Sequence, residues 1–181
     1  MKSYYLLLTT MLILSYSCIE PDVSIPQEPE FYVGTATAEM NGDSVNARTS
    51  RVQPTRPGGA IYSLRLDTDY SAGDVSPDIH FSQLPLKTDT LFLQDGSSQF
   101  TLPTAQLYLS NGDVLGGFYN LLATDTVADF IQFTKLDTAS KAVEGIFQAS
   151  FVVDTSLLGG AAAFYPDTLI FRKGAFQTKL Q

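Results

Sequence analysis

Short runs in which apolar and polar residues alternate occupy the chain from Phe31 onward. The clearest run has two distinct faces, one with Phe147, Ala149, Phe151 and Val153, the other with Ile146, Gln148, Ser150 and Val152. Residues 62–66, 79–82, 105–109 and 131–134 alternate in the same way. A period of two places successive side chains on opposite faces of a strand, and no long segment repeats apolar residues at helical spacing. The pattern predicts an all-β domain.

Turn residues separate these runs and predict how the strands are joined. Asn41-Gly42 and Asn111-Gly112 favour tight hairpins, because both centres of such a turn need the positive φ that Asn and Gly tolerate. Asp95-Gly96, Lys173-Gly174 and residues 137–142 are weaker signals of the same kind. We expect about nine or ten antiparallel strands, arranged as a β-sandwich or a partly closed barrel.

Small residues mark two places where a strand should be interrupted. Gly116-Gly117 lies inside a strand-like run and predicts a bulge. Residues 159–163 have side chains too small to pack a strand. They predict a loop, or a short helical turn, before a last hairpin.

The N-terminus has the features of a lipoprotein signal peptide. Lys2 precedes an apolar run at residues 4–14, which is about 11 residues and shorter than the roughly 18 to 20 that a membrane-spanning helix needs. Residues 14–18, Leu-Ser-Tyr-Ser-Cys, resemble a lipobox, so residues 1–17 are expected to be removed and Cys18 to be acylated. Ordinary secretion, with a free thiol at Cys18, is the alternative.

Residues 18–30 are expected to form a tether between the lipidated Cys18 and a single domain at residues 31–181. Three prolines keep the segment extended, and acidic residues keep it solvated. Glu20 and Asp22, just behind Cys18, resemble the signal that directs Bacteroidota lipoproteins to the outer face of the outer membrane. A plain solvated tether is the alternative, so periplasmic and surface exposure both stay open.

Net charge excludes one class of partner. The chain has 11 basic and 19 acidic residues, which give a formal charge of −8. Nucleic-acid sites need clustered Lys and Arg, so no nucleic-acid partner is expected. The excess of acidic residues also disfavours electrostatic binding to anionic lipid. The acyl anchor alone should therefore attach the protein to the membrane.

The second half of the chain resembles a known family. Residues 131–137 and 143–149 are similar to a hairpin shared by Bacteroidota lipoproteins that are grouped as a domain of unknown function. Asn41-Gly42 and the closing Gly174-Ala175-Phe176 fit the same family. The resemblance implies an envelope lipoprotein with no catalytic residue to carry over, in which Gly145 constrains the backbone and Phe147 belongs to the core.

Few residues suggest chemistry. His80 is the sole histidine and falls in a strand on its polar face, where a solvent-facing role is expected. Residues 67–78 contain the densest acidic cluster, but the calcium-loop pattern fails because Ala72 replaces Gly and Asp78 replaces Glu. We therefore expect no metal, no cofactor and no catalytic residue.

Two functional classes are consistent with the sequence. The favoured one is a non-enzymatic envelope module that binds a glycan, a protein or a small ligand, or that serves as a subunit of a complex. The alternative is a carboxylate-dependent hydrolase, for example one active on glycans. The chain has no Trp, so Tyr62, Phe92 and Tyr108 are the aromatics expected to contact a ligand if they are not packed.

Overall fold

Antiparallel strands make up most of the described part of the domain. The computed structural model describes residues 31–69, 71, 75–94, 102–111, 114–122, 127–157 and 165–181. The strands are β1 (Tyr32–Met40), β2 (Asp43–Ser50), β3 (Gln53–Pro54), β4 (Ile61–Thr68), β5 (Ser76–Pro85), β6 (Thr90–Phe92), β7 (Thr104–Asn111), β8 (Val114–Leu121), β9 (Phe130–Leu136), β10 (Ala142–Val153) and β11 (Thr168–Lys179). One 3-10 turn, Thr155–Leu157, follows β10.

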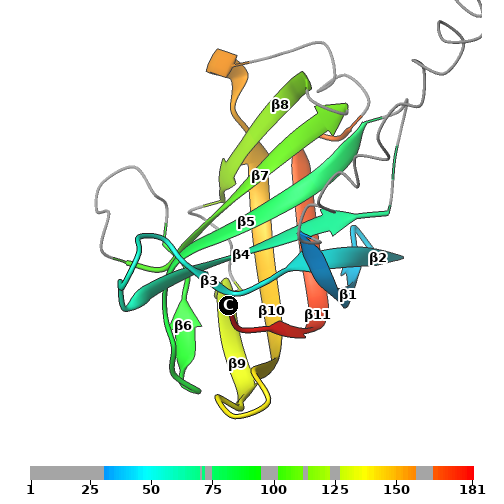
Figure 1. Cartoon of the computed structure of the whole chain (residues 1–181). Helices are drawn as coiled ribbons and strands as arrows, with labels where there is room; N and C mark the ends of the chain where they lie inside the picture. Colours follow the sequence, from blue (N-terminus) through cyan, green and yellow to red (C-terminus); the bar gives the residue numbers. More distant parts are fainter. Residues whose placement is uncertain are drawn as a thin grey trace, which may run out of the picture. The chain divides into compact units, whose positions relative to one another are not determined.

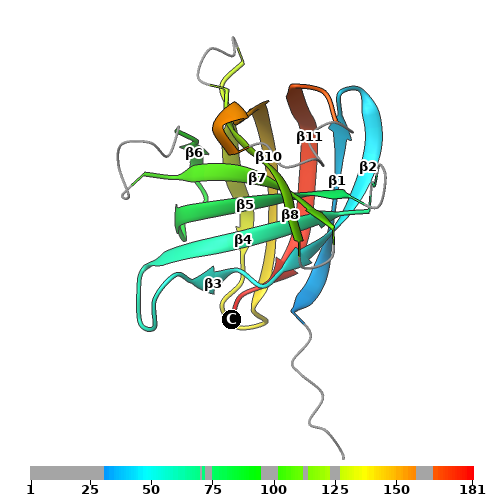
Figure 2. The same cartoon turned by 90° about the horizontal axis from the view of Figure 1, so that it is seen from above.

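The eleven strands form one sheet that curls back on itself. Its order is β11-β1-β2-β4-β5-β7-β8-β10, and β10 also pairs with β11, which closes a ring of eight strands (Figures 1 and 2). From β10 the sheet continues outward through β9 to β6, while β3 pairs with β4. The prediction of an antiparallel all-β fold, a sandwich or partly closed barrel, is confirmed. The structure has more strands than the expected nine or ten because it includes two very short ones, β3 and β6.

Apolar side chains fill the interior of the ring, on the faces that the alternation predicted. Phe147, Ala149 and Phe151 are buried, and so are Leu107 and Ile131. Aromatic rings meet edge to face in this core, with centroids 5.4 Å apart for Phe81 and Phe147. The other face of these strands carries mostly polar groups, of which Asp78 and Ser150 are buried as well.

The first hairpin matches its turn signal. Asn41 and Gly42 have φ values of 51° and 95°, and Met40 pairs with Asp43 on either side of them. Residues 137–142 also connect two paired strands, β9 and β10, where the Asp137 amide donates to the Ala142 carbonyl at 2.9 Å. Both turn predictions are confirmed.

The second predicted hairpin lies partly outside the described residues. Asn111 pairs with Val114 across β7 and β8, and Gly112, the other residue of the predicted Asn111-Gly112 turn, is not among the residues that the structure describes. Within β8 the predicted bulge is confirmed, because Leu109 pairs with Gly117 and Ser110 with Leu115, which leaves Gly116 without a partner across the ladder. Asp95-Gly96 and residues 159–163 lie outside the described residues.

The turn predicted at Lys173-Gly174 is wrong. Both residues lie inside β11, where the pairing with β10 shifts register, and Lys173 has a φ of 52°. Gly174 pairs with Phe147, whose ring lies over it so closely that a Cβ on Gly174 would come within 2.5 Å. The glycine signal therefore marks a bulge covered by an aromatic ring rather than a chain reversal.

Gly145 forms a second contact of the same kind. It pairs with Phe176 across β10 and β11, and a Cβ would come within 2.3 Å of that ring. Phe176 in turn packs edge to face against Phe133 at 6.1 Å. Two glycines on neighbouring strands thus let two phenylalanine rings approach the backbone closely.

Candidate functional site

A polar pocket of about 570 Å³ lies on the outside of the ring, across β4, β5 and β7. Strand alternation places its residues: Leu64 and Leu66 point inward, so Arg65 between them points outward. In the same way, Asp78 and His80 flank the buried Ile79. Register then aligns the strands, with Arg65 opposite His80 and Asp78 opposite Tyr108.

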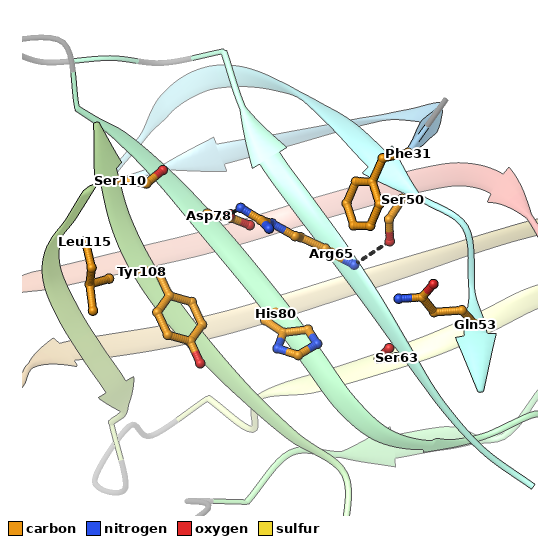
Figure 3. Close-up of a pocket in the computed structure, with 10 residues that line it drawn as sticks. All are labelled: Phe31, Ser50, Gln53, Ser63, Arg65, Asp78, His80, Tyr108, Ser110 and Leu115. Atoms are coloured by element: carbon orange, nitrogen blue, oxygen red, sulfur yellow. Dashed lines mark hydrogen bonds and ion pairs between the residues drawn. The ribbon is translucent and has the colours of Figure 1, made fainter. Parts of the chain in front are cut away.

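The apolar side chains of the pocket lie toward its two ends. Figure 3 shows Phe31 at one end and Leu115 with Tyr108 at the other, while Arg65, Asp78 and His80 lie between them. Serine and glutamine side chains complete the lining: Ser50, Gln53, Ser63 and Ser110. The pocket therefore offers apolar surface at both ends and hydrogen-bonding groups along its length.

An ion pair between Arg65 and Asp78 forms the centre of the pocket. The Arg65 guanidinium contacts Oδ2 of Asp78, and the side chain of Asp78 is only 3% exposed against 43% for Arg65. Oδ1 of Asp78 is buried and has no hydrogen-bond partner within the described part of the chain. Burial raises the pKa of Asp78, and the hydrogen bond and charge of Arg65 oppose that rise. A buried carboxylate oxygen is thus left to accept a hydrogen bond.

A second ion pair lies beside the first. Arg48 contacts Asp67 at 2.5 Å, and Asp67 is the register partner of Asp78 on the neighbouring strand. The Arg48 guanidinium also lies 4.5 Å from the centre of the Tyr32 ring, a cation–π distance. Burial, more than the surrounding charges, raises the pKa of Tyr32 to about 12. Two carboxylates that would otherwise repel are therefore each held by an arginine.

These pairings bear on the acidic segment at residues 67–78. Its first and last acids, Asp67 and Asp78, are engaged by Arg48 and Arg65. Across the part of the chain that the structure describes, no group of three His, Cys, Asp or Glu side chains could hold a metal ion. The two ends of the segment meet as paired strand residues rather than as ligands of one loop.

His80 lies on the polar face of β5, as predicted, but it faces the pocket rather than open solvent. Burial lowers its pKa, and the positive charge of Arg65 lowers it further. Among the described residues, no hydrogen bond joins His80 to Asp78 or Ser63, and none is drawn in Figure 3. The imidazole therefore contributes an uncharged polar surface at neutral pH.

The one histidine gives a direct test of this environment. In proton NMR, the imidazole signals of His80 should titrate with a midpoint below 6.5, the ordinary value. Because the folded pKa is lowered, the stability that His80 contributes is present above pH 6.5 and is lost as the pH falls through its folded pKa. In Arg65→Met the midpoint should move up toward 6.5. A wild-type midpoint at or above 6.5 would contradict the placement of His80.

Of the three aromatics singled out from the sequence, only Tyr108 lines the pocket. Its hydroxyl donates to Oε1 of Gln106 at 2.8 Å, and its ring packs edge to face against Phe118 at 5.1 Å. Burial, and then the charge of Asp78, raise its pKa. Tyr62 packs against the core and Phe92 is 59% exposed on β6. Cys18 lies outside the described residues.

Sequence reasoning missed the pairing of Arg65 with Asp78. Each residue sits between buried apolar neighbours, so alternation alone places each on the outer face. Their contact depends on the register of β4 against β5, which contains a shift between Tyr62 and Leu64. The sequence signal for this ion pair was the presence of charged residues at outward positions within two strands.

Fold and pocket together define an all-β protein with a charge-balanced polar pocket on the outside of its sheet. No family model, curated protein or solved structure matches the chain. Within the described residues, no helix has the length and apolar character needed to span a membrane.

Proposed function

We propose that this protein is a cell-envelope lipoprotein whose domain binds a small polar ligand in the pocket on β4, β5 and β7. One observation carries the binding function: Asp78 lines a pocket of about 570 Å³, and its buried Oδ1 has no hydrogen-bond partner among the described residues. Leaving such a group unsatisfied costs about 1 to 3 kcal/mol, so a ligand that donates to it recovers that energy. The volume falls within the roughly 300 to 1,000 Å³ of typical ligand sites.

The state of the carboxylates supports binding rather than hydrolysis. A carboxylate-dependent hydrolase needs one acid that holds a proton and a second that is free to attack or to activate water. Asp67 and Asp78 are adjacent, but each forms an ion pair with an arginine. Neither is placed across an open cleft from the other, because they are register partners on neighbouring strands.

The anchoring part of the proposal rests on the N-terminal sequence. Lys2, the apolar run at residues 4–14 and the lipobox-like residues before Cys18 support export and acylation. The acidic residues behind Cys18 support the outer membrane as the destination. Membership in the Bacteroidota lipoprotein family that residues 131–149 resemble is part of the same proposal.

Nuclear magnetic resonance of the full-length protein in micelles tests the binding function. The ¹⁵N-labelled chain would be titrated with neutral sugars, inorganic phosphate, choline and the dipeptide Gly-Gly. At least one probe should shift the amide signals of β4, β5 and β7 in a saturable way, and the variant Ser110→Arg, which places a long side chain at the pocket, should abolish that shift. Saturable shifts confined to other strands, or none with any probe, would contradict the proposal.

Substitution of Cys18 tests the anchor. Cys18→Ser should abolish acylation and the lipoprotein-type cleavage before residue 18, while a chain that begins at Glu20 should be found in the soluble fraction. One myristoyl chain binds a membrane only marginally, at about 10⁴ M⁻¹, whereas several chains on one cysteine make release negligible. Fractionation and mass spectrometry of the mature N-terminus provide the measurement, and Ser24→Ala in the same segment is the control. If the mature wild-type protein begins at a residue other than an acylated Cys18, the proposed anchor is wrong.

A further inference from the structure

We propose that the ligand of this pocket is a neutral polyhydroxyl compound, namely a sugar unit that is either free or part of a glycan. This inference rests on the proposed binding function and adds the chemical class of the ligand. Four features carry it: the charge balance of the pocket, the unpartnered oxygen of Asp78, the exposed guanidinium of Arg65, and the apolar groups at both ends.

Charge balance disfavours an ionic ligand. The two guanidinium groups of Arg48 and Arg65 are matched by the carboxylates of Asp67 and Asp78. An anion that approached Arg65 would meet the buried charge of Asp78, and a cation that approached Asp78 would meet Arg65. A neutral ligand avoids both repulsions.

The central ion pair combines an exposed donor with a buried acceptor. The side chain of Arg65 is 43% exposed and can donate outward, while the buried Oδ1 of Asp78 has no hydrogen-bond partner among the described residues. Neighbouring hydroxyls of a sugar can donate to the carboxylate and accept from the guanidinium at the same time. Gln53, Ser63 and Ser110 add groups that both donate and accept.

The apolar groups suit the carbon face of a sugar ring. Phe31 is 46% exposed, and the Arg65 guanidinium lies 5.9 Å from the centre of its ring. Leu115, which is 59% exposed, lies with Tyr108 at the opposite end (Figure 3). A pyranose has C–H groups on its faces and hydroxyls on its edge, so it can pack on such surfaces while its edge reaches the ion pair.

A peptide ligand fits the geometry less well. Extended peptides are usually bound by adding a strand to a free sheet edge. The pocket lies on the face of β4, β5 and β7, and β5 is paired on both sides. The recognition groups are therefore side chains arranged over a sheet face, which suits a compact ligand.

The test uses the full-length protein in lauryldimethylamine oxide micelles, because that head group carries no sugar. Free D-glucose, D-galactose, D-mannose and N-acetyl-D-glucosamine form one arm, read by amide shifts. A glycan array probed with the labelled protein forms the second arm and separates free sugars from sugar units in chains. Inorganic phosphate, choline and Gly-Gly serve as ionic and peptide probes. We expect a neutral sugar or a glycan to bind and to shift residues of the pocket.

Two variants test the contacts. Asp78→Asn, which keeps the side-chain volume, should weaken sugar binding by about tenfold or more, because hydrogen bonds to charged groups contribute most. Phe31→Ala, at a position that is 46% exposed, should also weaken it. Asp167→Asn, an exposed acid that does not line the pocket, should leave binding unchanged. Unchanged binding in both pocket variants would overturn the assignment of these contacts.

The outcomes separate the two proposals. If phosphate, choline or Gly-Gly shifts the pocket residues while no sugar or glycan binds, the sugar assignment is wrong and the binding function stands. If no probe shifts the pocket residues, both are wrong.

Discussion

Replacement of Phe147 by Ala should lower the free energy of unfolding by about 3 to 5 kcal/mol, the range for removal of a large buried aromatic. The ring is 3% exposed and packs edge to face against Phe81 at 5.4 Å. It also covers the backbone at Gly174, where the bulge in β11 needs a residue without a side chain. The truncation therefore leaves a cavity and uncovers backbone. Urea unfolding of the variant and the wild type gives the measurement.

A matched truncation provides the control. Phe92 is 59% exposed on β6, so Phe92→Ala should change stability by no more than about 0.5 kcal/mol. Gly174→Ala should itself cost about 1 to 3 kcal/mol, since its Cβ would meet the Phe147 ring. Combined with Phe147→Ala, its cost should shrink because the clash is gone. A loss below about 1 kcal/mol for Phe147→Ala, or strictly additive costs, would mean that the ring does not cover Gly174.

The fold class could be predicted because its determinants are local. Strand faces follow from a period of two. The burial of Leu107, Ile131 and Phe151 could therefore be predicted without knowing which strands they pair with. The turn at Asn41-Gly42 could be predicted because its signal is also local in sequence. The turn predicted at Lys173-Gly174 was wrong because glycine is favoured both in turns and where an aromatic ring covers the backbone. Only the register of β11 against Phe147 distinguishes these two structures.

The pocket depends on contacts that no local pattern contains. Arg65 and Asp78 are 13 positions apart in sequence, and a shift of one residue in the register of β4 against β5 would separate them. Phe31 reaches the same pocket from the start of the domain. Alternation placed Arg65, His80 and Tyr108 on outer faces, but it could not show that these faces adjoin.

Replacement of Arg65 by Met should destabilise the domain strongly at neutral pH and much less in acid. The variant leaves the charge of Asp78, 3% exposed, without its partner. Breaking a fully buried pair costs about 3 to 5 kcal/mol, and because Arg65 is 43% exposed we expect about 2 to 3 kcal/mol at pH 7. Arg48→Met is the matched control, since that pair is more exposed, and it should cost less than about 1 kcal/mol.

The pH dependence follows from the direction of the pKa shift. The pKa of Asp78 is raised above 3.8 by burial and held down by Arg65, so loss of Arg65 should raise it further. A group with a raised folded pKa contributes stability that is present below its unfolded pKa and is lost as the pH rises through its folded pKa. In Arg65→Met the loss of stability that accompanies ionisation of Asp78 should therefore continue to a higher pH than in the wild type. Urea unfolding from pH 4 to pH 7 should show a deficit that grows with pH, and adding Asp78→Asn should remove most of it. A deficit that is the same at every pH would show that the cost comes from lost packing of the Arg65 side chain rather than from an unpaired Asp78 carboxylate.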